Sequence, residues 1–146
     1  MPSASFTITV ERPADHVFAY VADLRHGPEW FDMIDRVELV GGGEPGTVGA
    51  HFQVAAERAV FDDIVMDYRT AEVEPGRRVV FAVGHPKLEG TDTFVLTPEG
   101  TATEVTYTTD VTMKGLNKLA TPFMSGGLEH AATKAGPQLK AALERS

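Results

Sequence analysis

The sequence predicts an α+β domain in which a strongly curved antiparallel sheet wraps around a long C-terminal helix. About seven segments alternate apolar and polar residues, as strands with one buried face do. The connections between the later segments are too short for crossover helices, so these strands must be antiparallel. Residues 115–146 carry apolar side chains at steps of three and four, which is typical of one face of a helix.

The N-terminal part of the chain is predicted to hold one strand and two short helices. Residues 6–10 alternate apolar and polar side chains and form the first strand. Pro13 suits the first position of a helix, because the N–H that proline lacks has no helical partner there. An apolar stripe through residues 17–24 packs this helix down, the loop 25–28 ends it, and a second short helix follows.

The middle of the chain is predicted to be a meander of strands. Glycine- and proline-rich stretches separate the segments, and such residues favour turns. The strand segments are residues 37–40, 48–54, 64–68, 79–83, 93–96 and 105–113.

The C-terminal helix has an inner stripe built largely from small residues. Thirty residues of helix would span roughly 45 Å, so this helix is expected to cross the whole domain. Small side chains fill the space over a sheet poorly, which predicts a cavity between helix and sheet. Pro122 and Pro137 predict a break or bend. The stripe consists of Leu116, Leu119, Ala120, Phe123, Met124, Gly127, Leu128, Ala131, Ala135, Leu139, Ala142 and Leu143.

Length and composition exclude several classes of protein. With 146 residues the chain is expected to form a single domain, residues 1–146. No cysteine is present, which excludes disulfides, thiolate nucleophiles and cysteine metal sites. The net charge of -8 argues against nucleic acid as a partner. Neither a signal segment nor a membrane-spanning run is recognisable, so we expect a cytoplasmic protein without stable membrane insertion, either a monomer or a homodimer.

Motifs for metals, cofactors and hydrolysis are missing from the sequence. No serine lies in a Gly-x-Ser-x-Gly motif, and the glycine run 41–43 lacks the end of a phosphate-binding loop. We therefore expect no metal and no cofactor. The histidines, which show no metal-ligand spacing, are His16, His26, His51, His85 and His130.

Four segments in a fixed order carry a resemblance to a known superfamily. They read VERPADHVF at 10–18, PEWF at 28–31, GTVGA at 46–50 and VEPGRRV at 73–79. The chain as a whole resembles the SRPBCC superfamily of START and birch-pollen-allergen-like proteins, and most of all its polyketide cyclase/dehydrase branch. This resemblance implies a helix-grip fold around a deep, mostly apolar pocket. It implies a pocket rather than a reaction, because catalytic residues differ between branches.

Three functions follow from the pattern and the resemblance. The favoured hypothesis is binding of a small hydrophobic ligand, of lipid, polyketide or aromatic type, in a cavity between the sheet and the C-terminal helix. The first alternative is an enzyme, an aromatase/cyclase or dehydratase acting on a polyketide-like substrate. The second is a protein-interaction module, as in the co-chaperone-like or toxin-like branches of the superfamily.

Three polar residues are candidates for catalysis: Tyr68, Asp92 and Tyr107. Both tyrosines share the parity of the apolar positions in their strands, so their hydroxyls should point inward and bind a ligand oxygen or stabilise an enolate. The alternative is a pair of core tyrosines whose hydroxyls reach the surface or a backbone carbonyl. Asp92 shares the parity of Phe94, and in an apolar cavity its raised pKa would suit a general acid or base. Its place after a loop, however, favours a solvated carboxylate at a fraying strand end.

The predicted ligand-binding residues lie on the inner faces of the strands and of the final helix. Trp30, the single tryptophan, either stacks on a planar ligand at the pocket mouth or anchors its turn to the core. The set comprises Trp30, Phe52, Met66, Tyr68, Phe81, Phe94, Tyr107, Phe123, Met124, Gly127, Leu128 and Ala131.

Overall fold

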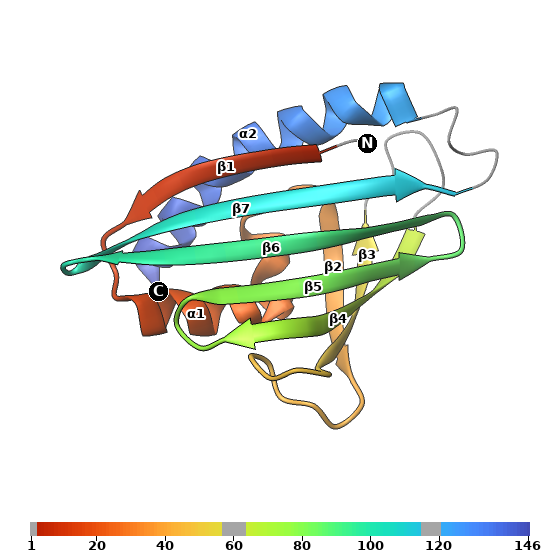
Figure 1. Cartoon of the computed structure of the whole chain (residues 1–146). Coiled ribbons are helices and arrows are strands. Elements are labelled where there is room, and N and C mark those ends of the chain that lie inside the picture. The colour runs from red at the N-terminus through yellow and green to blue at the C-terminus, as the bar shows by residue number, and fades with distance from the viewer. Residues whose placement is uncertain (1–2, 57–63, 115–120) are drawn as a thin grey trace.

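Seven strands form one antiparallel sheet in the computed structural model, in the order β1-β7-β6-β5-β4-β3-β2 (Figure 1). The structure describes residues 3–56, 64–114 and 121–146, and for 121–129 it describes the backbone alone. The strands are β1 Ser3–Val10, β2 Ile34–Val40, β3 His51–Ala56, β4 Ile64–Glu74, β5 Arg78–His85, β6 Leu88–Glu99 and β7 Ala102–Met113.

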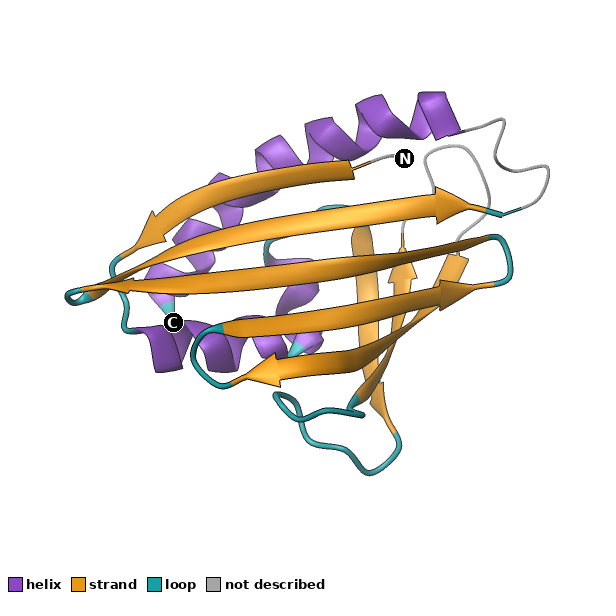
Figure 2. Cartoon of the chain, in the orientation of Figure 1, coloured by secondary structure: helices purple, strands orange, loops and turns teal. Residues whose placement is uncertain are grey.

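The helices lie on one side of this sheet, as Figure 2 shows. A helix α1, Ala14–Ala22, and a short 3-10 helix η1, Leu24–Glu29, connect β1 to β2. The long helix α2, Thr121–Arg145, follows the last strand. The predicted α+β helix-grip architecture, with two short helices after the first strand, is therefore confirmed.

The third strand begins later than the sequence predicted. β3 starts at His51, whereas the alternation of side chains had suggested residue 48. Gly46 and Gly49 adopt φ angles of 86° and 95°, which suit glycine and keep this stretch in a turn. Val48 is consequently an exposed turn residue.

β4 is longer than predicted because a bulge interrupts its alternation. The pairing of β4 with β5 shifts register between Thr70 and Glu72. One extra residue in a bulge changes which side chains face the core, so Thr70 is buried before it and Val73 packs against the core after it. A strict period of two could not follow the strand through this irregularity.

The C-terminal helix starts at Thr121, and the predicted earlier part, residues 115–120, lies outside the described residues. Pro122 is in the first turn of α2, where proline is tolerated. Pro137 lies inside α2, and the helix continues through it without a break. Figure 1 shows α2 as a curved helix, so bending accommodates the proline.

Small residues in the C-terminal half of α2 bring the helix onto β1 and leave no space there. A Cβ atom added to Gly136 would lie 3.3 Å from Cγ of Phe6 and 3.5 Å from Cγ2 of Ile8. Ala132 and Ala135 are buried beside it. For this half of the helix, the prediction that small residues leave a cavity is wrong, because the backbone itself approaches the strand.

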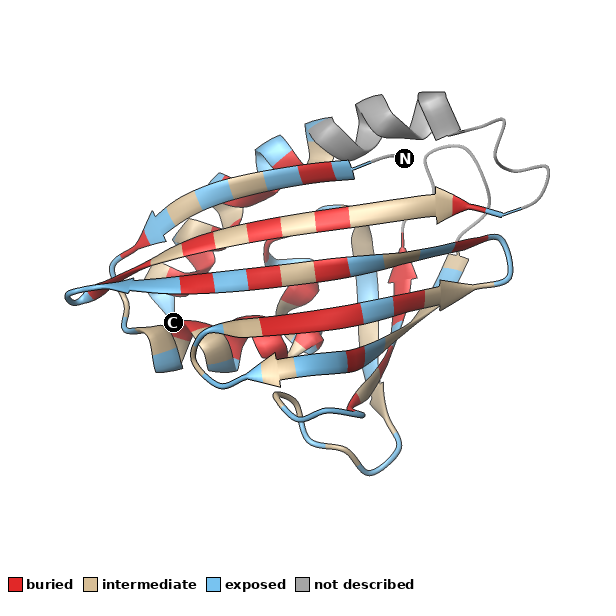
Figure 3. Ribbon diagram, in the orientation of Figure 1, coloured by how far each residue is buried: buried red, intermediate tan, exposed pale blue. Residues whose placement is uncertain are grey.

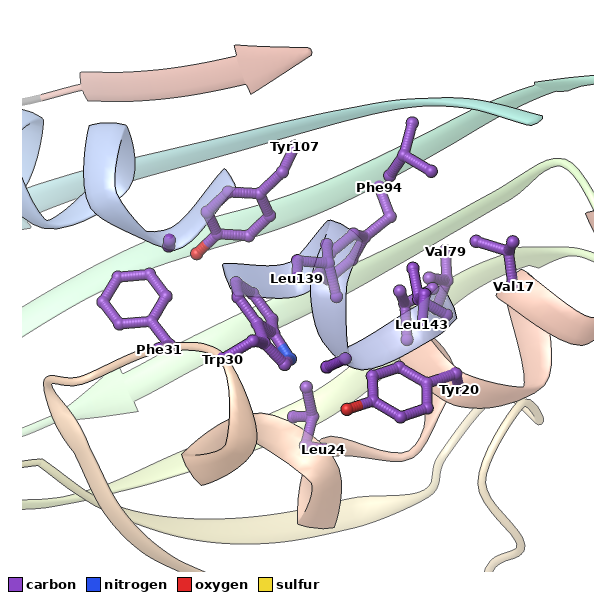
Figure 4. Packing of buried hydrophobic residues seen from close by; sticks show 14 of the residues in the cluster. Val17, Tyr20, Leu24, Trp30, Phe31, Val79, Phe94, Tyr107, Leu139 and Leu143 are labelled. Atoms are coloured by element: carbon purple, nitrogen blue, oxygen red, sulfur yellow. The ribbon is translucent and has the colours of Figure 1, made fainter. Parts of the chain in front are cut away.

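The core fills the concave side of the sheet. Buried and exposed residues alternate along the strands in Figure 3, as expected for a sheet with one solvent-facing side. In Figure 4, Leu139 and Leu143 of α2 lie among residues of α1, η1 and the sheet. A second cluster, which we call the distal cluster, consists of Val83, Leu88 and Met113, with Ile64, Met66, Tyr68 and Val111 packed against it.

Candidate functional site

A buried carboxylate lies on the concave face of the sheet. Asp92 is only 7% exposed and pairs with Phe81 of β5 and Thr109 of β7. The interpretation of Asp92 as a solvated strand-end residue is therefore wrong. The reason is that β6 already begins at Leu88, directly after the two-residue turn that follows His85, so that Asp92 lies well inside the strand.

Two hydroxyl groups donate hydrogen bonds to this carboxylate, one to each oxygen. The Tyr107 hydroxyl lies 2.9 Å from Oδ2 of Asp92, and the Thr109 hydroxyl lies 2.6 Å from Oδ1. The Tyr68 side chain faces the same carboxylate, and each of the two groups shifts the pKa of the other. We refer to Asp92, Tyr68, Tyr107 and Thr109 as the Asp92 cluster.

The register of the strands brings these four residues together. Thr109 is directly opposite Asp92, and Tyr107 is opposite Phe94, one inward-facing position further along. Tyr68 comes from β4, two strands away, which corresponds to roughly 10 Å across the sheet. Its long side chain reaches the carboxylate diagonally.

Burial is the main influence on the acidity of the cluster. It raises the pKa of Asp92 from 3.8 to about 6, although the hydroxyl groups of Thr109, Tyr107 and Tyr68 act in the opposite direction. Burial also raises the pKa of Tyr68 and of Tyr107 well above the usual value, and the negative charge of Asp92 raises both further. Near pH 7 the carboxylate is therefore mostly ionised, while both phenols keep their protons.

Aromatic rings surround one side of the cluster. The ring of Tyr107 lies 4.8 Å from that of Phe94 and 5.2 Å from that of Phe6, centroid to centroid. Trp30 contacts Phe6, Phe94 and Tyr107 edge to face and is itself only 4% exposed. Phe31 packs against both Trp30 and Tyr107 (Figure 4). The position of Trp30 agrees with an anchor of the η1 turn in the core, and ligand stacking by Trp30 stays a prediction.

The other side of the cluster is less tightly covered. Phe81, which pairs with Asp92, and Phe52, which pairs with Tyr68, are fully buried. Met66 and Tyr68, together with Gly90, keep part of their surface accessible. The Tyr68 hydroxyl is buried enough to have a raised pKa, and the residue as a whole still keeps part of its surface accessible.

The remaining predicted ligand-binding residues fall into two groups. Ala131 of α2 is partly buried and packs against the main core. Phe123, Met124, Gly127 and Leu128 lie outside the residues whose side chains are described. For all of them a contact with ligand stays a prediction.

Two threonines on the concave face were missed by the sequence analysis. Thr109 shares the parity of Tyr107, and this was the available signal. Thr70 is 2% exposed, and its hydroxyl has no hydrogen-bond partner in the described part of the chain. Thr70 shares the parity of Tyr68 in the same way, because the register shift of β4 comes only after it.

The described part of the structure shows neither a cluster of metal ligands nor a membrane-spanning helix. Among the side chains that the structure describes, in residues 3–56, 64–114 and 130–146, no group of three or more histidine, aspartate or glutamate residues is arranged to hold a metal ion. No helix in the same ranges is long and apolar enough to cross a lipid bilayer.

Known structures share this fold at low sequence identity. The Zhui aromatase/cyclase from Streptomyces sp. R1128 is 16% identical, with a TM-score of 0.79 over 98% of this chain and 93% of that one. A START superfamily protein from Mycobacterium smegmatis is 17% identical, with a TM-score of 0.73 over 98% of this chain and 97% of that one. The di-domain ARO/CYC BexL from the BE-7585A biosynthetic pathway is 21% identical, with a TM-score of 0.63 over 99% of this chain and 46% of that one.

Family membership follows from the sequence over nearly its full length. No curated protein matches the chain. The family model described as polyketide cyclase / dehydrase and lipid transport matches residues 1–144. With its helix-grip fold, the chain therefore belongs to the polyketide cyclase / dehydrase and lipid transport family.

Proposed function

We propose that the protein binds a small, mainly apolar molecule on the concave face of the sheet, with the polar end of the molecule at the Asp92 cluster. The observation that carries this proposal is a carboxylate held by hydroxyl groups within an otherwise apolar face. A buried charge costs free energy, so a protein that keeps one in its interior often uses it at a functional site. The family description, which includes lipid transport, supports a hydrophobic ligand.

The partly exposed residues indicate where the ligand lies. Met66 and Tyr68 on β4 and Gly90 on β6 keep accessible surface although they are on the inner face. Val83 lies between them and pairs with both Tyr68 and Gly90. We therefore place the ligand over the β4–β6 region, where the Asp92 cluster meets the distal cluster, away from the tightly packed contact of α2 with β1.

Ligand binding is tested with a panel of fatty acids, sterols, flavonoids and quinones, using thermal shift and native mass spectrometry. At least one class is expected to raise the melting temperature, because a ligand that binds only the folded state stabilises it. Met66→Trp fills the proposed site and is expected to abolish this rise while the protein stays folded. Val65→Trp is the matched control, since Val65 is the neighbouring exposed residue of β4.

Two results would contradict the proposal. One is a panel in which no apolar class changes the melting temperature. The other is a Met66→Trp variant that binds as well as Val65→Trp, because the ligand would then lie elsewhere.

A second function, proton transfer in an aromatase/cyclase or dehydratase reaction, is favoured by the acidity of the cluster. With a pKa of about 6, Asp92 can take a proton from a carbon between two ketone groups. The enolate carbon would then attack a second carbonyl, and the resulting alkoxide would take the proton back from Asp92. Tyr68 and Tyr107 would orient the substrate oxygens, and orientation alone accelerates such closures strongly.

This enzymatic function is tested by the products of a reactive poly-β-ketone. Wild type is expected to direct closure to one main product, whereas Asp92→Asn and Tyr68→Phe should return the mixture that forms without protein. If both variants keep the wild-type product profile, these residues have no catalytic role.

The third hypothesis, a protein-interaction module, finds little support in the described surface. The exposed large hydrophobic residues there are Val48, Val65 and Val95. They lie on a loop, on β4 and on β6, and β5 separates these two strands. They therefore form no contiguous apolar patch of the kind that marks an interface.

A further inference from the structure

We infer that His85 is a specificity-determining residue of the proposed site, and that its Nε2–H group donates a hydrogen bond to a carbonyl oxygen of the ligand. This inference rests on the proposed binding function and specifies a second polar group of the ligand, at the end away from the Asp92 cluster. It follows from the place of His85 in the sheet and from the hydrogen bond that holds its ring.

His85 belongs to the concave face of the sheet, at the last residue of β5. It pairs directly with Leu88, a buried residue of the distal cluster. Side chains of directly opposite residues in antiparallel strands lie on the same face. Val83, two positions earlier on β5, is also part of the distal cluster. Both neighbours therefore place the side chain of His85 on the inner face.

The row of inward-facing residues that contains His85 is otherwise apolar. The register of β4 against β5 pairs Asp67 with Gly84, so Met66 lies across from His85 at the next position. Leu88 lies on the other side of His85. His85 is thus a polar side chain between two apolar ones.

The accessible surface of this row is at His85 and Met66. Both residues are partly exposed, whereas Leu88 and Met113, further along the row, are buried. Met66 is one of the residues whose accessible surface marks the proposed ligand position. A ligand over the β4–β6 region therefore meets the imidazole ring of His85 as well.

A backbone hydrogen bond determines which nitrogen of this ring carries the proton. Nδ1 of His85 accepts from the N–H group of Lys87 at 3.0 Å. A neutral imidazole has one donor and one acceptor nitrogen. Because Nδ1 is the acceptor, the proton is on Nε2. Nowhere in the described part of the chain does Nε2 have a hydrogen-bond partner.

An N–H donor at an apolar surface favours a ligand that brings an acceptor. When an apolar group covers the donor, the donor loses water without gaining a partner, which costs free energy. A ketone or ester carbonyl at the same place accepts the hydrogen bond. The His85 ring therefore discriminates between ligands of equal shape that differ in this one oxygen atom.

The separation of the two polar positions indicates an elongated ligand. His85 is two residues along β5 from Val83, which pairs with Tyr68, and four residues from Phe81, which pairs with Asp92. At the rise of a strand these steps correspond to roughly 7 and 13 Å. A ligand of this length can have one polar group at the Asp92 cluster and its carbonyl group at His85.

His85→Asn removes the donor and keeps the turn. An asparagine oxygen commonly accepts a hydrogen bond from the backbone N–H two residues later, so the bond from Lys87 can still form. The shorter side chain has no Nε2–H group that could reach the ligand. His16→Gln is the matched control. His16 is also partly buried, and its Nε2 is hydrogen-bonded to Oγ of Ser146, at the end of the domain away from the β5–β6 turn (Figure 1).

The affinity test compares two probes of the same shape, 6-acetyl-2-naphthol and 6-isopropyl-2-naphthol, by isothermal titration calorimetry at pH 7.5. The ratio of their affinities isolates the carbonyl oxygen. In His85→Asn the acetyl probe should lose about three- to ten-fold relative to the isopropyl probe, as one hydrogen bond allows. In His16→Gln the ratio should equal that of wild type.

NMR of protein with ¹⁵N-labelled histidine tests the contact itself. Long-range ¹H–¹⁵N spectra distinguish the two neutral forms of the ring, and the signals of His85 are those missing from His85→Asn. The free protein is expected to show the proton on Nε2. The acetyl probe should shift the Nε2 resonance more than the isopropyl probe does, an effect that a merely structural histidine would not show.

The outcomes separate this inference from the proposed function. An affinity ratio that is the same in wild type and His85→Asn, or a proton found on Nδ1, overturns the role of His85 and leaves the binding function intact. If neither probe binds up to its solubility limit, the proposed function itself is contradicted and the inference falls with it.

Discussion

Asp92 lowers the stability of the folded protein at neutral pH. The unfolded chain releases the Asp92 proton near pH 3.8, whereas the folded protein holds it up to about pH 6. Between these values the folded state binds more protons than the unfolded state, so the free energy of unfolding falls as the pH rises. Above pH 6 the loss is complete and amounts to about 3 kcal/mol.

Asp92→Asn should remove this loss. Relative to wild type, the variant is expected to gain unfolding free energy between pH 4 and pH 7, by up to about 3 kcal/mol. Urea denaturation of both proteins at several pH values measures the difference. A difference that stays constant with pH would show that Asp92 titrates alike in the folded and unfolded states, contrary to its buried position.

Thr70 provides a second prediction for a single residue. Its buried hydroxyl has no partner, so Thr70→Val, which keeps the shape of the side chain, should raise the free energy of unfolding by about 1 kcal/mol. Thr103→Val is the matched control. The equally buried Thr103 hydroxyl donates to the carbonyl of Arg12 at 2.8 Å, so the same change should lower stability there by about 1 kcal/mol. Chemical denaturation measures the free energy of unfolding of both variants. A loss of stability in both would mean that the Thr70 hydroxyl has a hydrogen-bond partner.

The sequence predicted the inward direction of single residues but not their partners. The alternation within each strand was sufficient to predict that the side chains of Tyr68, Asp92 and Tyr107 point inward. The hydrogen bond of Tyr107 with Asp92 depends on the register of β6 against β7, which the alternation within one strand does not determine. Asp92 was assigned to a strand end because the start of β6 was placed too late, and boundaries depend on turn geometry more than on alternation.

The helix α2 combines two kinds of contact along its length. Around Gly136 its backbone touches β1, whereas Ala131, less than two turns earlier, is only partly buried. The sequence showed one continuous small-residue stripe and could not distinguish a close approach from an unfilled space.

Substitution by leucine should affect stability and ligand affinity differently in these two regions of α2. Gly136→Leu places a large side chain where even a Cβ atom would be crowded by Phe6, so we expect a loss of several kcal/mol of stability, or failure to fold. Ala131→Leu should reduce the affinity for bulky ligands while costing at most about 1 kcal/mol of stability. Thermal denaturation and ligand titration of both variants test this. If Ala131→Leu is as destabilising as Gly136→Leu, residue 131 lies in packed core and does not border a ligand.

The sequence was most informative about the fold of the whole molecule. Strand alternation and short connections gave the antiparallel sheet, and four local segments pointed to the family that the match over residues 1–144 established. The fold depends on many residues that each contribute a little, so errors at the ends of β3 and β4 did not change it. The site depends on a few exact positions, and one error in register or boundary alters its chemistry.

The proposed ligand gives a reason for a carboxylate inside an apolar domain. In the proposed function, the stability that the buried Asp92 carboxylate costs is offset by its role in ligand binding. The distal cluster closes the far end of the sheet, and the main core under α2 closes the near end. A ligand between them would be held by apolar contacts and oriented by the two phenols.

The most direct test is an NMR titration of the Asp92 side-chain carboxyl carbon, carried out with and without 2-naphthol. We expect a midpoint at about pH 6 for the free protein and a clear change in the resonance when the ligand binds. A midpoint near the ordinary value of 3.8, together with a resonance that does not respond to any ligand that the protein binds, would contradict it.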